Sequence, residues 1–201
     1  MPDFRGTKCT ASKICRSNPC DVLWITTKAC CPDAVTVGAS YSPKINMSRF
    51  KDYANLFAEN GDFDIPENYA LGVAVKVTPA VQVALDYTRI NYSGVASIGN
   101  ASSDPAAPGF GWQDVKTVKL GVQWQANDTW TLRAGYNKGD NPINAQNVTF
   151  NILAPGVIEE HLTLGVTMKL DGDSEVSASY MHGFSNRVTG TGATPAGGTE
   201  T

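Results

Sequence analysis

The chain has 201 residues and a formal net charge of −3, so it is long enough for one folded domain and lacks the basic excess that nucleic-acid binding requires. No apolar run approaches the length of a transmembrane helix, which leaves the strands of a closed barrel as the only route across a membrane. We therefore expect no nucleic-acid partner.

The first 33 residues differ in composition from the rest of the chain. They contain all five cysteines, Cys9, Cys15, Cys20, Cys30 and Cys31. The count is odd, the spacing matches no zinc site, and the segment lacks the apolar core of a secretory signal. We expect residues 1–33 to be a foreign or mis-assigned leader outside the fold. A strand over residues 22–28 is a minor alternative.

Strand-like segments follow, over residues 34–42, 68–77, 80–92, 115–125, 129–138, 160–170 and 174–185. Their side chains alternate with a period of two, which places neighbouring residues on opposite faces. In the sixth segment, for example, Leu162, Leu164 and Val166 share one face, whereas Thr163 and Gly165 share the other. One face is apolar and the other is small, polar or charged.

The connections between these segments alternate strictly between short and long. Tight turns at Thr78-Pro79-Ala80, Ala126-Asn127-Asp128 and Asp171-Gly172-Asp173 consist of residues that favour a hairpin. The other connections, residues 43–68, 93–114 and 139–160, are far longer than an ordinary link between strands. All long connections should therefore emerge on one side of the sheet.

Alternation by itself fits a membrane barrel or a soluble sandwich equally well. Two further features favour the barrel: the loop asymmetry, and aromatic residues near the ends of the apolar faces, as at Tyr41, Tyr69, Trp124 and Trp130. The sequence thus predicts an all-β fold, an antiparallel transmembrane β-barrel that is incomplete, with about seven strands over residues 34–187. Residues 188–201 should form a flexible Gly/Thr-rich tail.

Several stretches resemble the FadL/TodX family of outer-membrane transporters for long-chain fatty acids and aromatic hydrocarbons. The matching text is Gly109-Phe-Gly-Trp-Gln-Asp-Val-Lys-Thr-Val-Lys-Leu-Gly121, Trp130-Thr-Leu-Arg-Ala-Gly-Tyr136, Ala154-Pro-Gly-Val, His161-Leu-Thr-Leu-Gly165 and Ser179-Tyr-Met-His-Gly183. The resemblance covers residues 34 to about 190.

The resemblance implies a location in the Gram-negative outer membrane and passive uptake of hydrophobic small molecules. Family members are fourteen-stranded barrels plugged by an N-terminal hatch. The order in which long and short connections alternate in this chain fits strands seven to thirteen of such a barrel. The hatch, the first half of the barrel and its closing strand would then be absent from this chain. Outer-membrane lipid and a fatty acid or aromatic hydrocarbon are the implied partners, and this chain is expected to be a fragment of such a channel.

A greasy stretch interrupts the first long connection. Over Asn46 to Glu59 the apolar residues recur at spacings of three and four, the pattern of one helical stripe, at Met47, Phe50, Tyr53, Ala54 and Phe57. The stretch predicts an amphipathic helix at the barrel mouth. Its stripe is either a binding surface for hydrophobic ligands or a packing surface without a ligand.

Inward-facing charges form the second candidate site, namely Lys76, Asp86, Lys119, Arg133 and Lys169. A cation among them would hold a fatty carboxylate, and Arg133 offers a planar fork for that purpose. We therefore take Lys119 and Arg133 as candidate ligand-binding residues. The alternative for each charge is an ordinary salt bridge or a hydrated side chain in the lumen.

Little in the sequence indicates catalysis. The two histidines, His161 and His182, lie near strand ends, and neither a nucleophile elbow nor a metal-ligand spacing accompanies them. We expect no enzymatic activity, no cofactor and no metal. The leading hypothesis is a fragment of a transporter for fatty acids or other hydrophobic compounds, and the alternative is a structural or adhesive soluble β-sheet domain.

Overall fold

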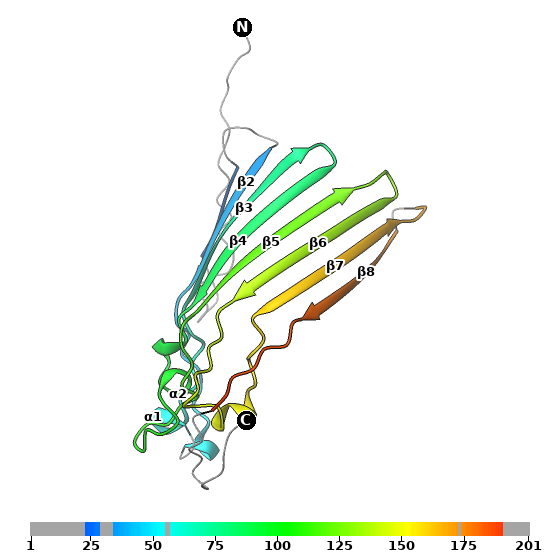
Figure 1. Cartoon of the computed structure of the whole chain (residues 1–201). Helices are drawn as coiled ribbons and strands as arrows, with labels where there is room; N and C mark the ends of the chain where they lie inside the picture. Colours follow the sequence, from blue (N-terminus) through cyan, green and yellow to red (C-terminus); the bar gives the residue numbers. More distant parts are fainter. Residues whose placement is uncertain (1–22, 29–33, 55–56, 173, 191–201) are drawn as a thin grey trace.

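A computed structural model describes residues 23–28, 34–54, 57–172 and 174–190. Within these ranges, none of the helices has the length and apolar character needed to cross a membrane. The architecture is one curved antiparallel sheet, with the long connections gathered at one end and the short turns at the other (Figure 1).

The sheet has eight strands in sequence order, each hydrogen-bonded to the next. They are β1 (Leu23–Lys28), β2 (Val35–Ser42), β3 (Asn68–Thr78), β4 (Val81–Ile90), β5 (Val115–Gln125), β6 (Trp130–Gly139), β7 (Glu160–Lys169) and β8 (Glu175–Gly183). No pairing among the described residues joins β1 to β8, so the sheet is open with these two strands at its edges.

The seven expected strands are confirmed as β2 to β8, and every end lies within two residues of its predicted position. An additional strand, β1, lies inside the expected leader, where the sequence carried only a weak strand signal. It pairs with β2 from Leu23 opposite Tyr41 to Lys28 opposite Thr36. The sequence signal was weak because six residues are too few for a reliable period-two pattern. The strand forms because its pairing supplies hydrogen-bond partners to the backbone along the outer side of β2. The five cysteines lie outside the described residues.

Side chains stabilise the short turns. Thr78 Oγ1 accepts hydrogen bonds from the backbone N–H groups of Ala80 (3.2 Å) and Val81 (3.0 Å). Asn127 Oδ1 likewise accepts from Thr129 (2.9 Å) and Trp130 (2.8 Å). Asx and Ser/Thr turns of this kind close a hairpin locally, which explains why sequence alone locates these two turns.

The strand register sorts side chains into rows that run across the sheet. One row consists of Val35, Val75, Val83, Val122, Ala134, Leu164 and Tyr180, which are all apolar or aromatic. The adjacent row on the opposite face consists of the small residues Thr36, Ala74, Ala84, Gly121, Gly135 and Thr163 on β2 to β7, and it ends at Met181 on β8. We call these surfaces the apolar face and the polar face.

Tyrosines follow an oblique line across the apolar face. Tyr41 and Tyr69 occupy one row of this face. Tyr87, Tyr136 and Tyr180 follow in successive rows of the same face, each one row further from the long connections than the one before. A membrane boundary crosses tilted strands in this oblique manner, because tilt shifts the register relative to the bilayer plane. The apolar face therefore has the layout of a lipid-facing surface.

The buried hydrophobic residues lie in the long connections and not in the sheet. Among the described residues they are Ala58, Val95, Ile98, Phe110 and Ile143. Short helical turns occur in the same region, namely η1 (Lys51–Tyr53), α1 (Ala58–Gly61), η2 (Tyr92–Gly94), α2 (Ala96–Gly99) and η3 (Phe150–Leu153). The sheet thus has one layer, and a small core covers only its end.

The assignment of faces predicts unequal effects of two neighbouring substitutions in β7. Leu164→Arg would place a charge on the apolar face and should destabilise the chain in a lipid bilayer by roughly 2–4 kcal/mol. Thr163→Arg faces the polar side, opposite Gly135, and should cost much less. Urea titration of each variant in bilayers measures both effects. Equal destabilisation would mean that the faces are wrongly assigned.

Candidate functional site

The long connections pack against one another at one end of the sheet (Figure 1). The backbone N–H of Ala58, in the connection between β2 and β3, donates to the carbonyl oxygen of Pro108, in the connection between β4 and β5, over 3.0 Å. The Ser97 hydroxyl donates back to the carbonyl oxygens of Ala58 (3.3 Å) and Asp62. These loops therefore form one joined structure above the strand ends.

Aromatic side chains fill the space between the loops. The loop aromatic cluster, as we call it, consists of Phe50, Phe57, Phe63, Tyr92, Phe110, Trp112 and Phe150. Ring centroids lie 5.4 Å apart for Phe57 and Phe63, and 5.0 Å apart for Phe110 and Phe150. Edge-to-face and tilted contacts at such distances are favourable beyond the area that they bury.

Phe110 is the centre of this cluster. Its ring contacts those of Phe57 (5.8 Å), Phe63 (6.1 Å), Trp112 (6.1 Å) and Phe150 (5.0 Å), and the residue is only 7% exposed. These partners come from all three long connections. One residue of the Gly-Phe-Gly-Trp stretch therefore brings together segments that are far apart in the sequence.

The two glycines that flank Phe110 allow this close packing. Gly111 has a φ of +68°, and a Cβ added to it would overlap the Asn147 side chain. A Cβ on Gly109 would lie 2.6 Å from the carbonyl oxygen of Ala96. A larger residue would thus collide at either position and would also be strained at Gly111.

Two buried asparagines join the connection between β6 and β7 to the connection between β4 and β5. Asn147 Oδ1 accepts hydrogen bonds from the backbone N–H and the hydroxyl of Ser102, each over 2.8 Å. Asn151 Nδ2 donates to the carbonyl oxygen of Phe110 over 2.7 Å, and its Oδ1 accepts from Trp112 Nε1. Both asparagines are at most 4% exposed, so their hydrogen bonds replace those that water would supply.

The predicted continuous helix over residues 46–59 is wrong. Among the described residues of that range, the helical elements are the 3-10 turn η1 and the start of the short α1. Phe57 is extended (φ −121°, ψ 155°), and Glu59 and Asn60 have positive φ angles of 52° and 61°. The apolar spacing reflects contacts with other loops and not one helical stripe. Because Phe63 and Phe110, from two different long connections, attract these rings, the chain follows an irregular path instead of the local periodicity.

The residues expected on that stripe lie at the border of the cluster. Phe57 is half-buried within it, whereas Phe50 and Met47 are 52% and 48% exposed. The Tyr53 side chain lies outside the described residues. Phe50 contacts the cluster through Phe63, with centroids 6.4 Å apart. Met47 and Phe50 therefore offer accessible apolar surface next to a packed aromatic core.

A buried carboxylate, Asp64, holds the loop that carries Met47. Asp64 accepts a hydrogen bond from the Met47 N–H (2.8 Å) and pairs with Lys44 Nζ (3.0 Å), with its own side chain only 3% exposed. Burial alone would raise the pKa of Asp64, but the Met47 and Lys44 hydrogen bonds outweigh it and lower the pKa below its ordinary value. Burial and the neighbouring Asp64 raise the pKa of Asp62.

Arg133, on β6, has partners on both neighbouring strands. Its Nε donates to Gln123 Oε1 on β5 over 2.9 Å, and Nη1 donates to Thr167 Oγ1 on β7 over 2.6 Å. Thr167 in turn is hydrogen-bonded to Ser177 on β8 over 2.8 Å. The guanidinium is therefore held over the polar face and forms no ion pair with a described residue.

Lys119 is placed differently. It lies opposite Asp86 on β4 and Asn137 on β6, nearer to the long connections than Arg133. The expected inward orientation of both cations follows from the register, but the structure does not bring them into one site. Neither residue reaches the loop aromatic cluster. His161 and His182 also lie apart, because they belong to opposite faces.

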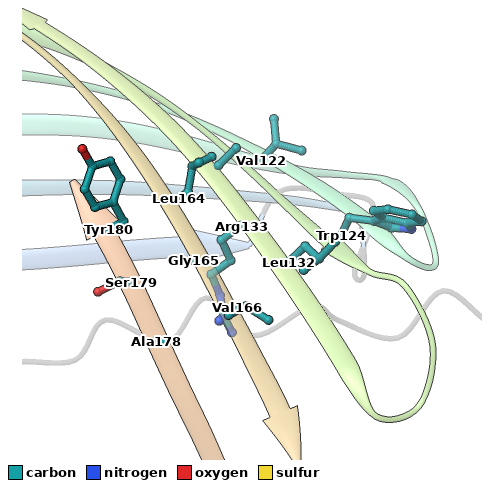
Figure 2. Close-up of a pocket in the computed structure, with 11 residues that line it drawn as sticks. Val122, Trp124, Leu132, Arg133, Leu164, Gly165, Val166, Ala178, Ser179 and Tyr180 are labelled. Carbon is teal, nitrogen blue, oxygen red and sulfur yellow. The ribbon is translucent and has the colours of Figure 1, made fainter. Parts of the chain in front are cut away.

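Two hollows lie back to back across the sheet at β5 to β8. The polar face has a pocket of about 460 Å³, lined in part by Gln82, Gln123, Arg133, Thr163 and Ser179. The apolar face has an open hollow of about 630 Å³ (Figure 2), whose floor is formed by small residues such as Ala134 and Ala178. Figure 2 shows the Arg133 and Leu164 side chains pointing to opposite sides of the sheet.

Sequence reasoning missed several residues of both sites. Phe110 was visible only as part of a motif, and Phe63, Phe150 and the two asparagines lie in loops without periodicity. Gln123 and Thr167 are ordinary members of their strands until the register brings them beside Arg133. The one sequence signal for Gln123 and Thr167 was the strand alternation, which places both on the polar face.

A protein-family model described as "Outer membrane protein transport protein (OMPP1/FadL/TodX)" matches residues 32–198 of this chain. A long-chain fatty acid transport protein of Escherichia coli O6:H1 is 27% identical over 138 residues, which cover 65% of this chain and 30% of that protein. The chain therefore spans less than a third of this curated relative.

Solved structures show the same fold. The toluene transporter TodX of Pseudomonas putida aligns with a TM-score of 0.59 at 21% identity, over 83% of this chain and 44% of that one. A FadL homologue of Pseudomonas aeruginosa aligns with a TM-score of 0.63 at 16% identity, over 89% and 47%. The chain spans just under half the length of these structures.

We expect Gly111→Ala to destabilise the packing of the long connections, because an alanine would be strained at this positive φ and its methyl group would displace Asn147. The loss should be on the order of 1–3 kcal/mol. Near-UV circular dichroism during urea titration would measure it through the aromatic residues. Gly94→Ala is the matched control, since a Cβ there has no atom within 4 Å. Equal behaviour of the two variants would contradict the role of Gly111.

The Asp64 site also predicts a pH dependence. Its pKa is lowered in the folded loop, so its contribution is fully present above the ordinary value of 3.8 and is lost as the pH falls through the lower folded pKa. Amide exchange of Met47, corrected for the intrinsic rate, should lose protection in that acidic range. Asp64→Asn should lower the protection already at neutral pH.

The control is Asp104→Asn, because Asp104 caps a separate turn through Ala106 and should leave Met47 exchange unchanged. Protection of Met47 that is independent of pH and of Asp64 would contradict this assignment.

Proposed function

Because this chain belongs to the OMPP1/FadL/TodX family of outer membrane transport proteins, we propose that it forms part of the wall and outer entrance of a channel for hydrophobic molecules. Long-chain fatty acids or aromatic hydrocarbons would cross passively, without chemical change and without a cofactor. The family belongs to the outer membrane of Gram-negative bacteria, and in that membrane the apolar face would contact lipid.

The observation that supports this proposal is the combination of exposed apolar side chains at the loop end of the sheet with a pocket on its polar face. At the loop end, where a hydrophobic solute would first arrive, Met47 and Phe50 are exposed, and the Phe50 ring belongs to the loop aromatic cluster through its contact with Phe63. The polar face then offers a pocket beside Arg133. Apolar capture followed by a partly polar pocket suits a molecule with a hydrophobic body.

The same residues carry the proposed roles. Met47, Phe50 and Phe57 would contribute to capture, and Lys119 and Arg133 would act as cations of the lumen. We keep Tyr53 in the capture group on its position in the sequence alone. Residues 1–33 are proposed to lie outside the family-related part, apart from the contribution of β1 to the sheet.

The alternative of a soluble structural or adhesive domain is less consistent with the apolar face. Leu71, Leu85, Leu120 and Leu164 are each between 47% and 56% exposed on that face, and no described element covers them. A soluble sandwich would bury such a surface under a second layer. A membrane removes the need for that layer, because lipid chains cover the apolar side chains.

The capture surface is testable by charge. Phe50→Asp combined with Phe57→Asp should weaken laurate or toluene binding by about 2 kcal/mol, given ~25 cal/mol per Å² of lost apolar contact. Equilibrium dialysis of the chain in nonionic detergent micelles measures the affinity. Phe50→Asp alone keeps the half-buried Phe57 in place and should give a smaller loss in the same direction.

A control for added charge is Gln146→Asp combined with Ser185→Asp, two exposed positions near the same end of the sheet. This variant should bind like the wild type. Unchanged affinity of both phenylalanine variants would mean that Phe50 and Phe57 only pack against other residues, and it would contradict their role in ligand capture.

A further inference from the structure

A polar hollow lies beyond the ends of β4, β5 and β6, between the connection from β4 to β5 and the connection from β6 to β7. It has a volume of about 500 Å³, and its lining includes Arg89, Ser93, Asp114, Lys116 and Asp140. Its described lining contains none of the candidate ligand-binding residues considered so far. We call it the outer polar hollow and treat it as a site of its own.

The strand register places the charged residues of this hollow on the apolar face. Arg89 lies opposite Lys116, and the next row of the same face, further from the long connections, pairs Tyr87 with Val118. The Asp140 backbone N–H donates to the carbonyl oxygen of Lys116 over 2.9 Å, so Asp140 continues the row of Lys116 just past β6. These charges therefore lie on the outside of the channel wall.

The depth of the hollow is set by the tyrosine line. Tyrosines of a membrane barrel lie at the level of the lipid headgroups, and Lys116 is one row beyond Tyr87 on the side of the long connections. Val118 and Leu120 follow Lys116 on the same face of β5, and each is 48% exposed. Long connections of such barrels are extracellular. The hollow is thus at headgroup depth in the outer leaflet, with an apolar surface beneath it for acyl chains.

The Arg89 guanidinium is oriented by residues of the hollow and its border. Its Nε donates to Asn91 Oδ1 and its Nη2 donates to Asp114 Oδ2, each over 3.0 Å. Asp114 Oδ1 in turn accepts hydrogen bonds from the backbone N–H (3.1 Å) and the hydroxyl (2.7 Å) of Ser93. Because this frame already fixes the guanidinium, its remaining N–H groups can bind a ligand at a low entropic cost.

The charges of the hollow are mixed, and this restricts the ligand. Asp114 balances Arg89, whereas the Lys116 ammonium forms no ion pair with a described residue. Asp140 Oδ2 accepts the Lys116 backbone N–H over 3.2 Å, and a carboxylate has further acceptor capacity. Cations bind a phosphate, and carboxylates bind hydroxyl donors. A phosphate on a hydroxyl-bearing sugar satisfies both kinds of group, whereas a simple anion would also meet the two carboxylates.

We propose that the outer polar hollow binds the phosphorylated sugar headgroup of an outer-leaflet glycolipid, whose acyl chains lie along Val118 and Leu120. The Lys116 ammonium and the Arg89 guanidinium hold the phosphate, and Asp140 accepts hydrogen bonds from the sugar. A bound headgroup would join two of the long connections from the membrane side. The inference goes beyond transport and depends on one part of the proposed function, the contact of the apolar face with lipid.

The test is native mass spectrometry of the full chain in nonionic detergent micelles with lipid A, a phosphorylated glucosamine disaccharide that carries acyl chains. Lys116→Gln, at an exposed position, should weaken lipid A binding about 10-fold. Lys138→Gln is the matched control, because Lys138 lies on the same face of the next strand but pairs with Glu160 (2.7 Å) and does not line the hollow. The control should bind lipid A like the wild type.

Two further lipids separate the parts of the headgroup. Phosphatidylglycerol has a phosphate without a sugar, and a diglucosyl diacylglycerol has sugars without a phosphate. Each should bind roughly 10-fold more weakly than lipid A, because each leaves one kind of polar group in the hollow without a partner. Inorganic phosphate in large excess should not displace lipid A, because it lacks both the sugar and the acyl chains.

Several results would overturn the inference. They are equal binding of phosphatidylglycerol and lipid A, equal losses for Lys116→Gln and Lys138→Gln, and displacement of lipid A by inorganic phosphate. If the wild type entered phosphatidylcholine bilayers but bound no lipid A, this inference would fail and the proposed function would stand. If the chain did not associate with bilayers at all, the lipid contact on which both depend would be wrong.

Discussion

The constraint on which this structure depends is that a backbone surrounded by lipid must find every hydrogen-bond partner within the protein. The ladder meets that requirement for β2 to β7, which are paired on both sides in a continuous antiparallel register with one shift between Lys76 and Thr78, whereas the edge strands β1 and β8 are paired on one side only. A continuous register also keeps every inward residue in a row with the inward residues of its neighbours. The apolar face, the tyrosine line and the row of Arg133 all follow from this alignment.

The long connections leave the sheet at its end and are free of that constraint, so their backbone is irregular and side chains stabilise it. Phe110 supplies the apolar centre, and Asn147 and Asn151 supply the hydrogen bonds that water would otherwise make. Because these contacts join loops that are distant in sequence, each loop depends on the others for its conformation. The proposed capture surface at Met47 and Phe50 therefore belongs to a connection with a packed support, although these two residues are exposed.

The two candidate sites use different physics. At the loop end, removal of apolar area from water provides the driving force and discriminates little between hydrophobic molecules. Beside Arg133 the small residues Gly121, Gly135 and Gly165 leave room, and a fixed cation adds a directional interaction. A channel with both features would admit hydrophobic molecules broadly at its entrance and distinguish among them within its lumen.

The sequence by itself determined β2 to β8, the turns between them and the two faces, because period-two alternation and turn chemistry are local. Thr78 and Asn127 close their own hairpins, and parity alone directs Arg133 inward. It also led to the wrong helix over residues 46–59, since the spacing of Phe50 and Phe57 arises from contacts with Phe63 and Phe110. Only the tertiary structure decided which loops meet and which residues hold Arg133. Register and loop packing depend on partners far along the chain, and no local pattern identifies the buried Thr167 or Asn151 as such a partner.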